Sequence, residues 1–117
     1  MTVKYVDAIL EQVDITNDTI YTAPTATNFE SAHIIFGNCT NEGTVDTELT
    51  VNVVQNGESV GVANRYLPPR VIFAGQYDPL TPLVGRVLKG GDYISVIGSL
   101  VDNLNLSIGI KEIYTDS

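Results

Sequence analysis

Residues 104–111 have the sequence Leu-Asn-Leu-Ser-Ile-Gly-Ile-Lys, with an apolar residue at every second position. Residues 49–53, Leu-Thr-Val-Asn-Val, repeat this pattern in the middle of the chain. A period of two places one set of side chains on a buried face of a β-strand and the other set toward solvent. β-Branched residues are frequent in both stretches and suit a pleated, half-buried surface. Both stretches are therefore predicted to be strands.

Similar stretches, separated by turn residues, occur along the whole chain. Asn56-Gly57 is the strongest hairpin signal, because a type I′ turn needs positive φ at both central positions. Val6–Val13 is the one stretch that could pass for a short helix, and it lacks a persuasive cap. The predicted strands lie near Val3–Ile9, Thr19–Thr22, Ala32–Cys39, Glu48–Gln55, Ser59–Tyr66, Arg70–Ala74, Leu83–Leu88, Asp92–Gly98 and Asn103–Tyr114.

Many short strands and no helix long enough for a parallel crossover predict an all-β protein. We favour a two-sheet antiparallel β-sandwich, either Ig-like or jelly-roll in topology. The chain has 117 residues, of which 44% are hydrophobic, and this is enough for a single domain (residues 1–117) with its own core. Met1–Val13 is a candidate N-terminal arm that would add a strand to a neighbouring molecule.

The chain is strongly acidic, with 6 Lys and Arg against 14 Asp and Glu and a net charge of −8. Nucleic acid and anionic membranes attract basic surfaces, so neither is an expected partner. No apolar run approaches the roughly 18 residues of a membrane span. The first residues also lack the basic and apolar regions of a signal peptide, so none is expected.

The residue inventory offers little for catalysis. Cys39 and His33 are the only residues of their kinds, so the chain predicts neither an intrachain disulfide nor a zinc site. We expect Cys39 to be a small buried hydrophobe and His33 to be a structural strand residue. The chain contains no G-x-S-x-G, P-loop or G-x-G-x-x-G motif. We therefore predict a non-enzymatic protein without cofactor or metal.

One segment differs from the rest in charge. Residues 65–89 hold four of the six cations and one carboxylate, so their net charge is +3 in an otherwise acidic chain. The same segment contains four of the five prolines. One interpretation is a connection across the sandwich with prolines at a sheet edge. The other is a stiff partner-binding loop, because Tyr and Arg are enriched in interface hot spots. Its candidate contact residues are Arg65, Tyr66, Arg70, Tyr77 and Arg86.

The order of several motifs resembles that of small β-sandwich accessory proteins of tailed-phage virions. Ile20-Tyr21-Thr22-Ala23-Pro24 matches a "YT-x-P" opening, and Phe36-Gly37-Asn38-Cys39-Thr40 matches a strand that runs into an Asn-containing turn. Leu88–Ile94 matches an "L-x-x-GD-x-I" hairpin, and the last strand ends in Glu112-Ile113. The resemblance covers about Thr19 to Ile113, and the chain departs from it between Arg65 and Pro82.

The resemblance implies a structural role on a virion assembled in the host cytoplasm. The first hypothesis is a capsid decoration or cement protein that binds the outer surface of the major capsid protein lattice. Such a protein would be a homo-oligomer, with a trimer favoured because closed rings suit a symmetric lattice. A neck, tail or baseplate component of the virion is the second hypothesis. A glycan-binding adhesion module is the third, because six Tyr side chains could serve as sugar platforms.

Overall fold

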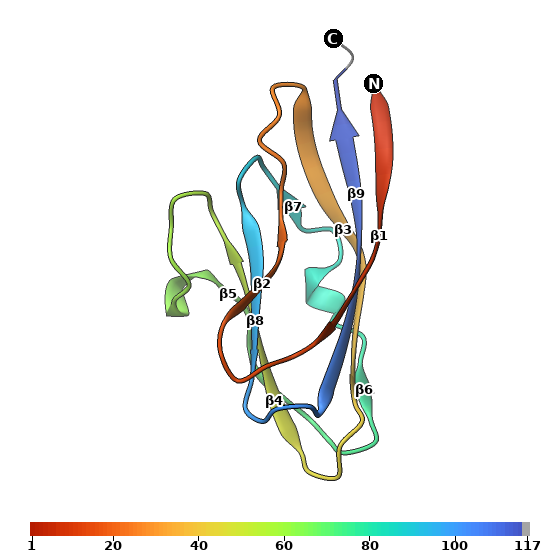
Figure 1. Cartoon of the computed structure of the whole chain (residues 1–117), viewed down its shortest axis with the longest axis vertical. Coiled ribbons are helices and arrows are strands. Elements are labelled where there is room, and N and C mark those ends of the chain that lie inside the picture. Colours follow the sequence, from red (N-terminus) through yellow and green to blue (C-terminus); the bar gives the residue numbers. More distant parts are fainter. Residues whose placement is uncertain (116–117) are drawn as a thin grey trace.

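Two antiparallel sheets pack face to face in the structure, so the predicted all-β sandwich is confirmed (Figure 1). The computed structural model describes residues 1–115, with the backbone alone described at positions 7–8 and 67–68. Sheet A has the strand order β1-β9-β3-β6, with β7 also paired to β3, and sheet B has the order β2-β8-β4-β5. The elements are β1 (Thr2–Gln12), β2 (Asp18–Thr22), β3 (Phe29–Asn41), β4 (Thr47–Val54), η1 (Val62–Asn64), β5 (Arg65–Ile72), β6 (Tyr77–Asp78), η2 (Thr81–Leu83), β7 (Val87–Leu88), β8 (Tyr93–Gly98) and β9 (Leu104–Tyr114).

The strand order is that of a jelly roll, which decides between the two topologies that the sequence left open. The chain passes from sheet A to sheet B and back several times, with β1 and β3 in sheet A and β2 and β4 in sheet B. Crossings of this kind build the two interlocked Greek keys of a jelly roll. The short strands β6 and β7 both pair with β3 and together take the place of one edge strand.

The core lies between the two sheets and contains the alternating residues that predicted them. On β9, Leu104, Leu106, Ile108 and Ile110 are all buried. They face the buried residues of β4 and β8, which include Leu49, Val51, Val53, Ile94 and Val96. The period-two interpretation of both stretches is therefore confirmed.

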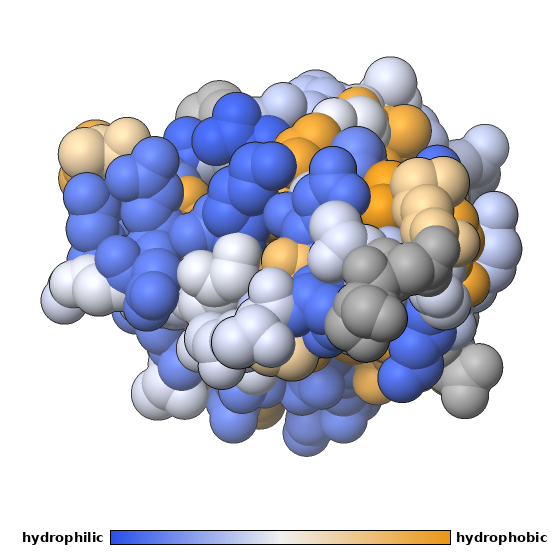
Figure 2. Space-filling view, turned by 90° about the horizontal axis from the view of Figure 1, so that it is seen from above, coloured by the Kyte–Doolittle hydropathy of each residue, from blue (hydrophilic) through white to orange (hydrophobic). Residues whose placement is uncertain are grey.

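The two ends of the sandwich differ. The β1–β2, β3–β4, β5–β6 and β8–β9 connections lie toward the end opposite the two termini (Figure 1). We call this end the loop end. At the other end, β1, β3 and β9 extend beyond most of sheet B (Figure 1). That end is mostly hydrophilic, with hydrophobic side chains gathered mainly on the side where sheet A lies (Figure 2).

The strand predicted near Val3–Ile9 lies within β1, so the helix alternative for Val6–Val13 does not apply. Three other local predictions were wrong. Leu83–Leu88 is not one strand, because η2 ends at Leu83 and β7 has only two residues. Ser59–Tyr66 is not a strand, because η1 interrupts it and β5 begins only at Arg65. The Asn56-Gly57 turn is not type I′, since Gly57 has a φ of 87° while Asn56 is not in the positive-φ region.

The residues before β5 fold back over sheet B for an identifiable reason. Asn52 is buried on β4, and its Nδ2 donates hydrogen bonds to Gly61 O at 2.8 Å and to Asn64 Oδ1 at 2.6 Å. Asn64 Oδ1 also accepts a bond from Gly61 N. These bonds hold residues 61–64 as a turn, although Val60 and Val62 imitate the spacing of a strand.

Candidate interaction surfaces

The five predicted contact residues lie on β5 and on the segment that forms the edge of sheet A, and three of them, Arg65, Tyr66 and Arg86, line one pocket. Arg70 lies on β5, and its Nε is 2.9 Å from Asp78 Oδ2 on β6. Arg86 lies just before β7, and its guanidinium carbon is 4.8 Å from the ring centre of Tyr66 on β5. Both contacts join the edge strand of sheet B to the segment that forms the edge of sheet A. Arg70, Arg86 and Tyr66 thus fasten the two sheets to each other at this side of the sandwich.

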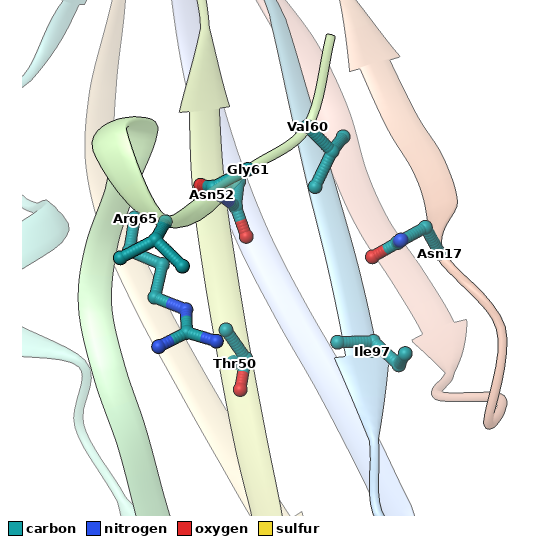
Figure 3. Close-up of a pocket in the computed structure, with 8 residues that line it drawn as sticks. Asn17, Thr50, Asn52, Val60, Gly61, Arg65 and Ile97 are labelled. Atoms are coloured by element: carbon teal, nitrogen blue, oxygen red, sulfur yellow. Dashed lines mark hydrogen bonds between the residues drawn. The ribbon is translucent and has the colours of Figure 1, made fainter.

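Tyr77 and Arg65 are the two predicted residues with exposed side chains outside these contacts. Tyr77 is 68% exposed on β6. Arg65 lies beside Thr50 of β4 on the outer face of sheet B, under the loop that carries Gly61 (Figure 3). The cavity there measures about 240 Å³, and Arg65 is its one charged lining residue. The Asn52 amide is already bonded within the fold, so the cavity offers a single cation and no acid–base pair.

A buried carboxylate lies at the end that carries the termini. Glu112 of β9 is 5% exposed and accepts hydrogen bonds from the Tyr21 hydroxyl at 2.5 Å and the Tyr114 hydroxyl at 2.7 Å. Burial and the bond to Glu112 raise the pKa of Tyr21, and the bond to Glu112 raises the pKa of Tyr114. Each carboxylate oxygen thus accepts one phenol hydrogen bond, and the three side chains line a pocket together with Lys4 of β1.

His33 and Cys39 have the surroundings of structural residues. His33 Nε2 is 3.0 Å from Ser31 Oγ. Cys39 is fully buried, and burial raises the pKa of its thiol to about 12. Among the side chains that the structure describes, which leave out positions 7–8 and 67–68, no three of His, Cys, Asp or Glu come close enough to hold a metal ion. Within residues 1–115, no helix has the length and apolar character to cross a membrane.

The loop end carries an apolar surface that the sequence analysis did not identify. Each of its four loops exposes at least one large apolar side chain, and each of these side chains is 40% to 60% exposed. They are Ile15 in β1–β2, Val45 in β3–β4, Phe73 in β5–β6, and Leu100 and Val101 in β8–β9. The same loops contain Asp14, Glu42, Asp46 and Asp102 and no Lys or Arg. The surface is therefore both apolar and acidic.

Hydrogen bonds from backbone N–H groups fasten these loops to one another. Asp14 O accepts a bond from Gly98 N at 2.8 Å, which joins the β1–β2 loop to the end of β8. Glu42 N donates to Asn103 O at 2.8 Å, and Asp46 Oδ1 accepts from Ala74 N at 3.0 Å. Neighbouring loops are thus tied in pairs around the end of the sandwich. Functional contacts are commonly carried by loops that a rigid scaffold positions in this way.

Asn41, at the end of β3, connects two of the loops. It is fully buried. Its Nδ2 donates to Val45 O at 2.9 Å and to Ile72 O at 2.8 Å, while its Oδ1 accepts from Gly43 N at 2.9 Å. Its backbone also bonds with the β5–β6 loop, because Asn41 O accepts from Gly75 N. One buried amide therefore positions both Val45 and the end of β5.

Comparison with known proteins supports the fold assignment. No family model and no curated protein sequence matches the chain. A structure from Bacillus endospore appendages, described as disulfide-linked pili, is similar with a TM-score of 0.54 and 16% identity, covering 99% of this chain and 88% of that chain. A structure of infectious bursal disease virus, Gx strain, is similar with a TM-score of 0.50 and 10% identity, covering 99% of this chain and 34% of that chain.

At these identities, the likeness shows a shared fold. Both similar chains come from multi-subunit assemblies, a pilus and a virus particle. This chain corresponds to about a third of the viral chain and to most of the pilus chain. Its fold is thus one that is found in assembled structural proteins.

Proposed function

We propose that the chain is a non-enzymatic structural protein of a virion, a capsid decoration or cement protein that binds the outer surface of the major capsid protein lattice. The observation that carries this proposal is the loop end, where five large apolar side chains are exposed on four interlinked loops. A concentration of exposed apolar side chains on a small protein is typical of a protein-binding surface. The acidic residues around it favour a partner surface with basic groups.

The preorganisation of the loops strengthens this interpretation. Docking a flexible loop costs ordering entropy, whereas loops that are already hydrogen bonded lose little on binding. The cationic segment, residues 65–89, then has a secondary role in binding the capsid. Arg65 and Tyr77 remain candidate contact residues, while Arg70, Tyr66 and Arg86 first serve to join the two sheets.

A fibre subunit is a second candidate function, favoured by the pilus neighbour, which covers nearly the whole of both chains. That neighbour belongs to pili described as disulfide-linked. The one cysteine of this chain, Cys39, is buried in the core. A fibre of this chain would therefore be held by non-covalent contacts between folded subunits.

The first test is the copy number of the protein in purified virions, measured by quantitative mass spectrometry against the major capsid protein. A copy number within a few-fold of the capsid subunit supports decoration. A number that corresponds to one ring would move the protein to the neck or tail, and absence from virions would contradict the proposal.

The second test uses variants of the loop end. Val45→Asp and Phe73→Asp, made together, add charge to two exposed apolar positions and should abolish binding to capsids while leaving the fold intact. Val62→Asp is the matched control, because Val62 is 75% exposed on η1, away from the loop end. Equal capsid binding by the loop-end variant and the control would refute the loop end as the docking surface.

A further inference from the structure

The four sheet edges differ in how well they are protected against pairing with another chain. In the described part of the chain, β6 and β7 have two residues each, and β2 has five with a register shift. The β5 edge contains Pro68 and Pro69 and two register shifts. Short strands, prolines and irregularities are the usual protection of sheet edges. The β1 edge is longer, with 11 residues and no proline, and its protection consists of one bulge and the charged residues Lys4, Asp7 and Glu11.

The side chains of β1 also suggest that its outer edge is a contact surface. Tyr5 is 66% exposed and Leu10 is 76% exposed, both on the outer face of sheet A. Val6 and Ile9 point to the opposite face and pack against the core. A long edge strand with exposed large apolar residues is a ready template for strand addition.

From this edge we infer that β1 pairs with β1 of a second copy, antiparallel and across a two-fold axis, with Lys4 of one copy opposite Glu11 of the other. In this register the paired residue numbers always add up to 15. Tyr5 then lies opposite Leu10, and Val6 lies opposite Ile9. Each copy contributes the same surface, as a two-fold contact requires.

The β1 bulge makes this register possible. In a regular strand, residues 4 and 11 would point to opposite faces, because side chains alternate with a period of two. The register of β1 against β9 shifts between Val6 and Ile9, so β1 contains one extra residue there. Lys4 and Glu11 consequently share the inner face, opposite Glu112 and Leu106 of β9. The bulge lies at the centre of the proposed pair, where both copies have the same irregularity.

Charge complementarity supports the same register. The carboxyl of Asp18 lies beside that of Glu11 and raises the pKa of Glu11 by a side-chain hydrogen bond, with burial as a further cause. This pair of acidic groups lacks a cationic partner among the contacts of the described residues. Lys4 of the second copy would supply a cation at this position, and opposite charges directly across two strands are favourable.

This inference deepens the proposed function, since antiparallel pairing of β1 would place one loop end at each pole of the dimer, and such a dimer could bridge two capsid subunits. Its test needs no virion, so the two proposals can fail separately. Sedimentation velocity of the full chain should show a concentration-dependent dimer. A monomer or a trimer at every concentration would overturn the inference.

Charge reversal tests the register. Lys4→Glu alone and Glu11→Lys alone should each weaken dimerisation by about tenfold, because both pairs of the dimer change from attraction to repulsion. The double variant should recover to within a few-fold of the natural chain. Lys89→Glu, an exposed reversal outside β1, is the control and should have no effect. Failure of the double variant to recover, with the fold intact by circular dichroism, would contradict the register.

Cross-linking gives an independent measurement. The double variant Tyr5→Cys/Leu10→Cys should form a disulfide-linked dimer on oxidation, because positions 5 and 10 face each other across the two-fold axis. Each single variant should stay unlinked, since position 5 lies far from position 5 of the other copy and Cys39 is buried. Equal cross-linking of the single and double variants would overturn the inference.

Discussion

Replacing Asn41 with alanine tests whether one buried amide holds the loop end together. The substitution removes hydrogen bonds of 2.8, 2.9 and 2.9 Å to the main chain of Ile72, Val45 and Gly43. Each such bond contributes a net of about 0.5–1.5 kcal/mol, and a buried carbonyl left without a donor adds a further penalty. We expect Asn41→Ala to lower the free energy of unfolding by about 2–4 kcal/mol.

The measurement is urea denaturation followed by tyrosine fluorescence and far-ultraviolet circular dichroism, because the chain has no tryptophan. In a thermal melt, the same loss should lower Tm by roughly 8–16 °C, at about 4 °C per kcal/mol for a domain of this size. Asn38→Ala is the matched control on the same strand. The Asn38 amide is half-buried and reaches only Thr40 Oγ1, at 3.5 Å. A loss below about 1 kcal/mol for Asn41→Ala, or a loss equal to that of the control, would refute the reasoning.

Two further predictions concern groups whose pKa the fold raises. Tyr21→Phe removes a donor to the buried Glu112 carboxylate and should cost about 1–3 kcal/mol, whereas Tyr93→Phe, which loses an exposed bond to Glu58 O, should cost less than about 0.5 kcal/mol. The folded-state pKa of Tyr21 is raised, so its contribution is complete below about pH 10 and is lost as the pH rises above this value. The stability of the natural chain should therefore fall more steeply than that of Tyr21→Phe in denaturation curves above pH 10, and parallel curves would contradict the assignment. The Cys39 thiol, with a pKa of about 12, should react with a thiol reagent at pH 8 only after unfolding in urea. Rapid labelling of the native protein would show that the thiol is accessible.

The strands that sequence analysis predicted well are those in which alternation and burial agree. On β9 and β4, apolar residues at every second position face the core, and the period of two was sufficient to identify them. The region before β5 was mispredicted because its fold depends on Asn52, a polar residue buried on another strand. A hydrogen bond between residues so far apart leaves no trace in local periodicity.

The two candidate surfaces differ in the same way: local sequence revealed one of them, and only the fold reveals the other. The cationic segment was found because its charge is local in sequence, but the fold uses Arg70 and Arg86 to join the sheets. The loop end was missed because Ile15, Val45 and Phe73 each stand alone in a polar loop. Single exposed apolar residues are ordinary on any protein surface. The jelly-roll topology brings the four loops to one end of the sandwich. Only there do these separate side chains become one apolar surface.

The two proposed contacts depend on different kinds of interaction, so they would contribute differently to an assembly. Pairing of β1 depends on main-chain hydrogen bonds along an open edge, and Lys4 and Glu11 select one register. Docking of the loop end depends on apolar contact by side chains that are held on interlinked loops. Added salt screens the attraction between exposed charges. It strengthens apolar contacts only when the salt, such as a sulfate, is excluded from the protein surface. If both contacts operate, added sodium chloride should weaken the selection of register in the dimer more than it weakens docking of the loop end.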